Sequence, residues 1–158
     1  MRLVLTVCAL AAVLAVGVTP ATAQTPLDRL VSRVNGVVIT ATDISQARLL
    51  KLVPDTRFDA ATQRELENRI LIIGELSRAG AIDPIDDAAV AARRREWEAS
   101  LGTPAAELMA QGDMNEKALV AWLRDDLRMR AFLQRQFGDR TTAKNEWIAR
   151  LRERAGLK

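Results

Sequence analysis

The sequence predicts a mainly α-helical protein: a compact bundle of about six helices with a small N-terminal β-hairpin. Two observations support this fold class. Apolar residues recur at helical spacing over most of the chain, between residues that favour helix starts and helix ends. Strand character is confined to one short segment, where β-branched stretches flank an Asn-Gly pair. The length of 158 residues fits a single domain.

The first 23 residues have the layout of a secretory signal peptide. Arg2 gives a positive start, residues 3–18 are uncharged and almost entirely apolar, and residues 21–23 match the small-residue pattern of a cleavage site. The run of 16 residues is short for a membrane span of about 20. We therefore expect cleavage after Ala23 and a periplasmic or secreted domain, residues 24–158, without stable membrane insertion. An uncleaved anchor is the alternative.

The composition excludes several classes of function. The chain has no His and only one Cys, so it lacks the imidazole of most hydrolytic sites and cannot form a Cys/His zinc site. Residues 24–158 carry a net charge of +2, which is too small an excess for a nucleic-acid surface. We therefore expect no cofactor, no metal and no nucleic-acid partner; a helix-turn-helix nucleic-acid binder is the weaker alternative.

Residues 30–40 predict the hairpin and the start of the first helix. Asn35 and Gly36 both accept the positive φ of a tight hairpin turn. A two-stranded hairpin is marginal in water, so a helix or a third strand must cover it. Thr40 is expected to cap the first helix, with Asp43 three residues later in position for a capping box.

The first helix is expected to run to about Val53, because a proline follows. The second helix should begin with Asp59 as its cap and end at Gly80. Its apolar stripe is wide, which indicates a central helix, and Gly74 within it is interpreted as a close helix crossing. The other helices are expected between these caps and ends: Asp83 (with Pro84 as first residue) to Gly102, Thr103 to Gly112, Asn115 to Phe137, and Thr142 to Gly156.

The charged clusters offer little for catalysis. Adjacent Asp residues occur at positions 86–87 and 125–126, but neighbours in a helix point in different directions and form no acid/base pair. The helix dipole explains the first pair, and a solvated face explains the second. The Arg-rich stretches 93–95 and 150–154 are interpreted as solvated, salt-bridged surface, with an anionic partner as the alternative.

Large or flexible apolar side chains in the second half of the chain are candidates for contacting client polypeptides. Such side chains line adaptable binding grooves, although at helical spacing they also form ordinary core. The candidate client-contact residues are Met109, Met114, Trp122, Met129 and Phe132.

One segment resembles a known family. The pattern V-N-G-x-x-I-T, followed by an acidic residue in the first helix, resembles the opening of the SurA-type periplasmic chaperones. The later helices are similar to that family's chaperone domain in their pattern of apolar residues. The residues that carry the motif are Val34, Asn35, Gly36, Ile39, Thr40 and Asp43.

The resemblance implies an ATP-independent chaperone domain of SurA N-terminal type that binds unfolded or extended segments of exported proteins, with outer-membrane proteins among its clients. It also implies a C-terminal helix that packs back on the N-terminal helices. Family members usually carry a histidine-dependent parvulin isomerase domain, yet Phe137 and Trp147 are only ten positions apart in the sequence. We therefore expect no prolyl isomerase activity and no enzyme. The alternative is a non-catalytic scaffold that binds one envelope partner or a second copy of itself.

Overall fold

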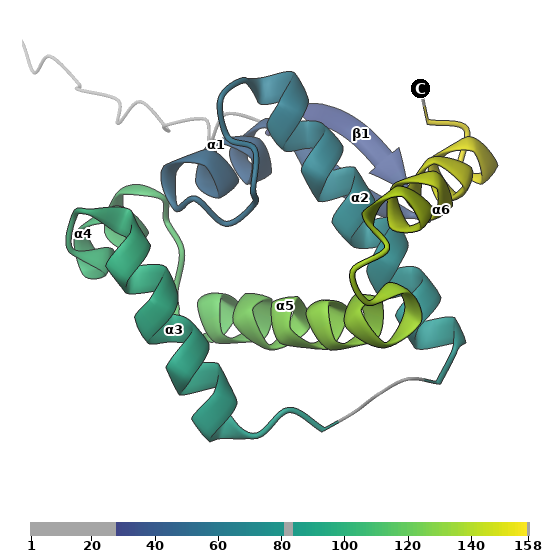
Figure 1. Cartoon of the computed structure of the whole chain (residues 1–158). Coiled ribbons are helices and arrows are strands. Elements are labelled where there is room, and N and C mark those ends of the chain that lie inside the picture. Colours follow the sequence, from purple (N-terminus) through teal and green to yellow (C-terminus); the bar gives the residue numbers. More distant parts are fainter. Residues whose placement is uncertain (1–27, 81–83, 158) are drawn as a thin grey trace, which may run out of the picture.

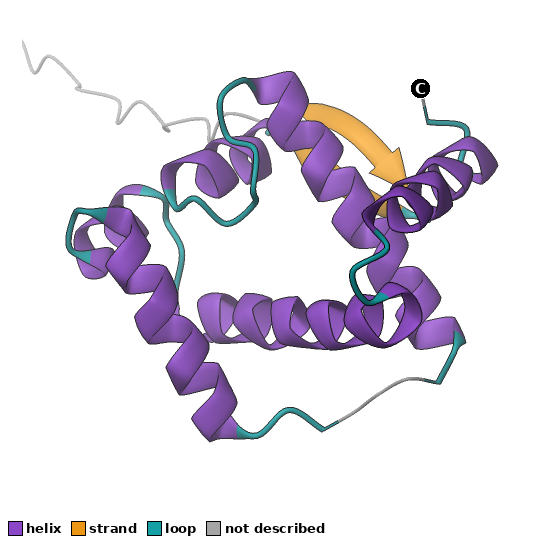
Figure 2. Ribbon diagram, viewed as in Figure 1, coloured by secondary structure: helices purple, strands orange, loops and turns teal. Residues whose placement is uncertain are grey.

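The computed structural model describes residues 28–80 and 84–157, and it is mainly helical, with six helices and an N-terminal two-stranded antiparallel hairpin in this part of the chain. The arrangement of these elements is drawn in Figure 1, and Figure 2 distinguishes helices, strands and loops. The fold class predicted from the sequence is confirmed. The predicted signal peptide, residues 1–23, and the predicted cap Asp83 lie outside the described residues.

The hairpin forms where the Asn-Gly pair predicts it. Strands β1 (Leu30–Val34) and β2 (Val37–Thr40) pair antiparallel around a turn in which φ is 50° at Asn35 and 84° at Gly36. Side chains alternate between the two faces of a strand, and Val34 and Ile39 are the buried ones here. They belong to a hydrophobic cluster that also contains residues of the following helices, which cover the hairpin.

Helix α1 (Ala41–Leu49) begins with the predicted capping box but ends earlier than predicted. Thr40 accepts a hydrogen bond from the amide of Asp43, whose carboxylate accepts one from the amide of Thr40. The helix ends at Leu49 and not near Val53, because Lys51 takes a left-handed conformation with φ of 47°. The amide of Leu52 then donates to the carbonyl of Ala47 at 2.9 Å, which satisfies an end carbonyl.

Helix α2 (Asp59–Arg78) starts at the predicted cap, Asp59, and so one residue earlier than predicted. Phe58 holds the capping position without a side-chain hydrogen bond, and Asp59 instead pairs with Arg48 of α1. The helix ends as predicted, with Gly80 at φ of 62°. A methyl group at Gly74 would lie 3.3 Å from the side-chain nitrogen Nδ2 of Asn35, so this glycine makes room for the hairpin turn and not for a crossing helix.

The remaining helices are α3 (Asp87–Leu101), α4 (Ala105–Gln111), α5 (Glu116–Phe137) and α6 (Thr141–Arg154). Helix α3 starts after Pro84 and not at it, because the carboxylate of Asp86 accepts from the amide of Ala89 and caps the helix there. Asn115 caps α5 as predicted. Helix α6 begins before Thr142, with Arg140 at the capping position and no side-chain cap.

Two hydrophobic clusters hold the elements together. The first cluster joins the hairpin, α1, α2 and α6, and the second joins the end of α1 to α3, α4 and α5. Val90 and Trp97, predicted to share a face of α3, both belong to the second cluster. Leu52 packs against both clusters, so the loop after α1 connects the two halves of the core.

Polar contacts of the segment after α1 close the elements into a ring. The indole of Trp97 on α3 donates to the carbonyl of Leu50, and the ammonium of Lys51 reaches the carbonyls of Ser100 and Leu101 at the end of α3. On the other side of the ring, α5 packs against both α2 and α3. Around the middle of Figure 1 the ring therefore runs from α1 through α2 and α5 to α3, and the segment after α1 closes it.

Candidate functional site

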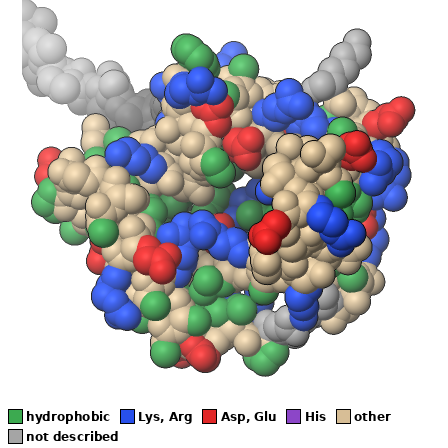
Figure 3. Space-filling view, viewed as in Figure 1, with side chains coloured by type: hydrophobic (Ala, Val, Ile, Leu, Met, Phe, Trp, Pro, Cys, Tyr) green, Lys and Arg blue, Asp and Glu red, His purple; other side chains and the backbone are tan. Residues whose placement is uncertain are grey.

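A cavity of about 850 Å³, called the central cavity below, lies inside this ring. Its wall comes from the loop at residues 51–54, from α2, α5 and α6, and from Arg93 of α3. In Figure 3 the molecule is hollowed near the middle of the face shown, and Lys and Arg side chains gather at the hollow. The volume is at the upper end of the range of about 300–1,000 Å³ typical of ligand sites.

Three helices each present one stripe of side chains to the central cavity. The stripe of α2 contains Arg64, Asn68 and Ile72, and the stripe of α6 contains Lys144 and Ile148, with further residues between them. The spacing of four residues places these side chains on one face of each helix. The apolar part of the wall consists of Leu52, Val53, Ile72, Met129, Leu133 and Ile148, with Pro54 and Ala149.

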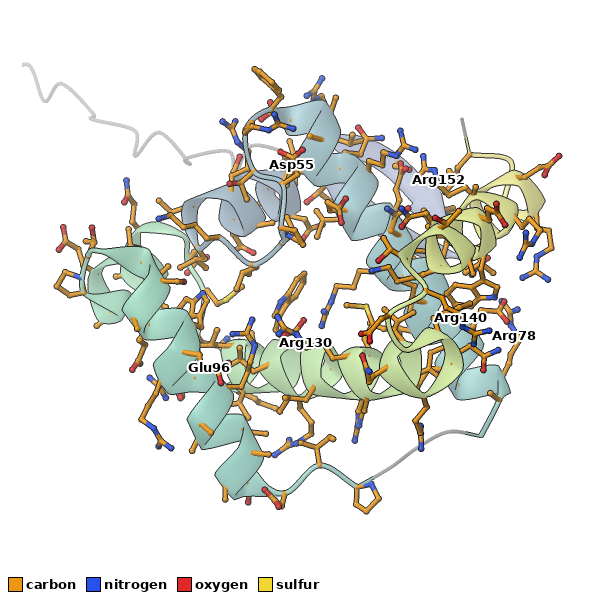
Figure 4. All side chains as sticks on the ribbon, in the orientation of Figure 1. Asp55, Arg78, Glu96, Arg130, Arg140 and Arg152 are labelled. Atoms are coloured by element: carbon orange, nitrogen blue, oxygen red, sulfur yellow. The ribbon has the colours of Figure 1, made fainter. Side chains whose placement is uncertain are left out.

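Positive charge dominates the polar part of the wall. Two carboxylates, Glu65 and Asp126, line the central cavity together with seven cationic side chains. Figure 4 labels two of these, Arg130 on α5 and Arg152 on α6, whereas Arg78 and Arg140 lie outside the wall. The cationic residues of the wall are Lys51, Arg64, Arg69, Arg93, Arg130, Lys144 and Arg152.

Arg69 of α2 is the most unusual of these cations. It is only 7% exposed, yet no Asp or Glu of the described residues lies within ion-pair distance of it. Its guanidinium stacks 3.9 Å from the ring centre of Trp122 and donates one hydrogen bond of 2.9 Å to the Trp122 carbonyl. Burial lowers the pKa of Arg69, and the charges of Asp126 and Asp125 oppose this shift in part. Buried charges are normally paired, so Arg69 is an exception that needs an explanation.

Arg152 of α6, in contrast, is neutralised by a buried partner. Its guanidinium lies 3.0 Å from the carboxylate of Glu67 on α2, and the two side chains are only 7% and 5% exposed. Ser32 of the hairpin and Gln63 donate further hydrogen bonds of 2.8 Å to the same carboxylate. Despite burial, which acts in the opposite direction, these bonds and Arg152 lower the pKa of Glu67. This network fixes α6 on α2 and on the hairpin.

Asp126 joins α5 to α3 from the wall of the central cavity. Its carboxylate lies 2.8 Å from Arg93 and 3.0 Å from Arg130, and its side chain is largely buried. The interpretation of residues 125–126 as a solvated face is therefore wrong for Asp126, whereas Asp125 is half-buried and pairs with Arg128. Arg93 has a second carboxylate partner in Glu96 at 3.5 Å, whereas Asp126 is the ion-pair partner of Arg130 among the described residues.

Arg64 and Lys144 add charge that no described carboxylate pairs with. Neither side chain forms an ion pair with the residues that the structure describes, and they approach the central cavity from α2 and α6. Glu65, next to Arg64, is half-buried; burial and the nearby charge of Asp55 raise the pKa of its carboxyl group. The excess of cations in the wall attracts negative charge. The ionised form of Glu65, in contrast, is disfavoured by burial.

The five candidate client-contact residues do not gather in one groove. Met129 lines the central cavity, and Trp122 lies beneath the guanidinium of Arg69. Met109 and Met114 line a second pocket of about 640 Å³ at α3, α4 and the start of α5. Phe132 packs against the ring of Trp147, with centroids 6.0 Å apart. The contact of these residues with clients stays a prediction.

The wall of the central cavity consists of charged, amide and apolar side chains. Among the described residues that line it there is no Ser, Thr or Cys to act as a nucleophile, and Asp126 is held by two guanidinium groups. In residues 28–80 and 84–157 no three acidic, His or Cys side chains gather as a metal site. No helix in this part of the chain has the length and apolarity to cross a membrane.

The sequence interpretation missed the cations of the central cavity. The Arg-rich stretches at 93–95 and 150–154 were expected on the surface, which holds for Arg94 with its partners Glu98 and Glu116 but not for the buried Arg152. The available signal was the repeat of polar side chains every four residues, such as Arg64 and Asn68, beside an apolar stripe. No protein-family model, curated protein or solved structure matches this chain.

Proposed function

We propose that this protein is a periplasmic, ATP-independent chaperone-like protein that holds extended segments of exported polypeptides and has no prolyl isomerase activity. The observation that carries the proposal is the central cavity, in which apolar side chains of three helices alternate with cations. A wall of this mixed kind can contact both the apolar and the polar side chains of a bound polypeptide. Such binding requires no reacting group. The helical fold with an N-terminal hairpin is the architecture that the SurA-type resemblance implies, and it supports the same proposal.

A chaperone of this kind binds weakly and by contact alone. Apolar wall residues such as Ile72, Leu133 and Ile148 would shield the apolar side chains of a client from water. Because ordering a flexible segment costs conformational entropy, we expect dissociation constants in the micromolar range. These correspond to a binding free energy on the order of 8 kcal/mol in favour of the complex. Outer-membrane proteins, which stay extended until they reach their membrane, are among the expected clients.

The decisive experiment measures aggregation of a chemically denatured client after dilution, with this protein at stoichiometric ratio. We expect suppressed light scattering without ATP. Ala149→Trp should weaken the effect, because Ala149 is exposed on α6 at the wall and a larger side chain fills the central cavity. Ala121→Trp, at an exposed position of α5 outside that wall, is the matched control. Unchanged aggregation with the unaltered protein in excess would contradict the proposal.

A second candidate function is a scaffold subunit that binds one envelope partner or a second copy of itself. The observation in its favour is an exposed apolar surface on the hairpin, with Leu30, Val37 and Val38, and at Phe58, which is 69% exposed. Light scattering after size exclusion and a pull-down from periplasmic extract separate the two functions. One stoichiometric partner favours the scaffold, whereas many substoichiometric clients favour the chaperone.

A further inference from the structure

The guanidinium of Arg69 offers hydrogen-bond donors that the described residues do not use. A guanidinium has five N–H donors, and the bond to the Trp122 carbonyl uses one of them. Stacking on Trp122 occupies one face of the group and leaves its edge for a partner. A planar edge of this kind matches a carboxylate with two parallel hydrogen bonds.

No carboxylate of the described residues forms an ion pair with Arg69, although the charges of Asp126 and Asp125 act on it from a greater distance. Arg64 and Lys144 lie in the same wall without an ion pair to a described residue, and Asp126 is already shared between Arg93 and Arg130. A buried, unpaired cation is costly to the folded protein, whereas an anionic ligand would remove that cost on binding. The charge of the wall is therefore complementary to an anion that enters the central cavity.

We propose that Arg69, supported by Lys144 and Arg64, forms a carboxylate-binding subsite of the central cavity that takes an acidic group of an extended polypeptide. The subsite rests on the proposed function and deepens it, because it names the chemistry that the bound segment must carry. The carboxylate is either the C-terminal one or that of an Asp or Glu side chain. A polypeptide is favoured over a free anion because Ile148, Leu133 and Met129 give the same wall an apolar part that inorganic phosphate would not use.

The test uses the unaltered protein and a short N-acetylated peptide of alanine, leucine and glutamine in three forms. One form ends in an amide, one has a free C-terminal carboxylate, and one is amidated with a single internal glutamate. Fluorescence anisotropy gives each affinity, and Trp122, stacked on Arg69, reports binding through its emission. We expect a carboxylate-bearing form to bind about 10-fold more tightly than the neutral one. The form that gains identifies the source of the carboxylate.

Variants locate the effect at Arg69. Arg69→Gln should bring the affinity for the acidic peptide down to that for the neutral peptide. Arg95→Gln, which removes an exposed charge of α3 outside the wall, should change nothing. Asp126→Asn should strengthen the preference for carboxylate, because it removes the carboxylate partner of Arg130 and one of the two carboxylate partners of Arg93. If Arg69→Gln does not fold, Lys144→Gln provides the same comparison, with a partial loss expected.

Equal affinities for the three peptides, a preference that survives in Arg69→Gln, or inorganic phosphate binding where no peptide binds would each overturn the subsite. Suppressed aggregation that is equally strong in Arg69→Gln would overturn the subsite and leave the proposed function intact. Conversely, a peptide preference without any effect on aggregation would support the subsite and contradict the chaperone function.

Discussion

The indole nitrogen of Trp97 donates a hydrogen bond of 2.8 Å to the main-chain carbonyl of Leu50, and both groups are buried. Leu50 is the residue after the last turn of α1, where helix carbonyls lack partners within the helix. A side chain of α3 therefore completes the end of α1 and fixes the second cluster to it. The same contact holds the start of the loop at residues 51–54, which lines the central cavity.

Trp97→Phe should lower the free energy of unfolding by about 1–3 kcal/mol, because it leaves the carbonyl of Leu50 buried without a donor. Urea unfolding followed by circular dichroism measures this change. Trp147→Phe is the matched control, since the indole nitrogen of Trp147 donates to no described residue and its ring packs against Phe137. Equal losses in the two variants would show that ring volume, and not the hydrogen bond, sets the cost.

Glu67→Gln should destabilise the protein at neutral pH by about 3–5 kcal/mol, because it removes the negative charge that lies 3.0 Å from the buried guanidinium of Arg152. The pKa of Glu67 is below its ordinary value of 4.5 in the folded state. The stability that this carboxylate contributes is therefore complete above that value and is lost as the pH falls through the folded pKa. Melting temperatures between neutral and acidic pH should fall less steeply in Glu67→Gln than in the unaltered protein.

Glu65→Gln should have the opposite sign, although the residue lies two positions away on the same helix. Burial, and then the charge of Asp55, raise the pKa of Glu65, so the ionised group is disfavoured in the folded state. The variant should be more stable than the unaltered protein at neutral pH, and the difference should vanish as the pH falls below the ordinary value of 4.5. A destabilised Glu65→Gln protein at neutral pH would contradict this assignment.

Gly36→Ala should lower the free energy of unfolding by about 1–2 kcal/mol through the backbone alone, because an added methyl group meets no atom within 4 Å while φ is 84°. Thermal unfolding measures the loss. Asn35→Gly, at the other central position of the turn, keeps positive φ accessible and should change stability little. A neutral Gly36→Ala substitution would contradict the expected cost of a left-handed backbone conformation at this position.

Local signals in the sequence predicted most of the elements, because caps and turns act over a few residues. Asn35 and Gly36, the capping box of Thr40, the cap Asn115 and the end at Gly80 all function as their chemistry indicates. Errors arose where a residue adopts a role outside its usual preference. Lys51 ends α1 in a left-handed conformation that glycine would normally supply, and its side chain is held by α3, which no local pattern reveals.

The candidate site was less accessible from the sequence than the fold. Whether a charged residue is buried depends on partners far along the chain: Glu67 meets Arg152, and Arg69 lies on Trp122. Helical periodicity groups residues on one face of one helix but does not tell which faces meet across the ring. For that reason Met129 was found among the candidates, while Arg93 and Arg152 of the same wall were assigned to the surface.

Val34 and Leu151 lie in the same hydrophobic cluster although more than a hundred residues separate them in the sequence. Contacts between such distant segments slow folding, because the intervening chain must first be brought into register. During synthesis the hairpin is therefore made long before α6, which packs against it. Until α6 has been made, the apolar face of the hairpin is only partly covered. The first cluster therefore cannot close before α6 has been synthesised.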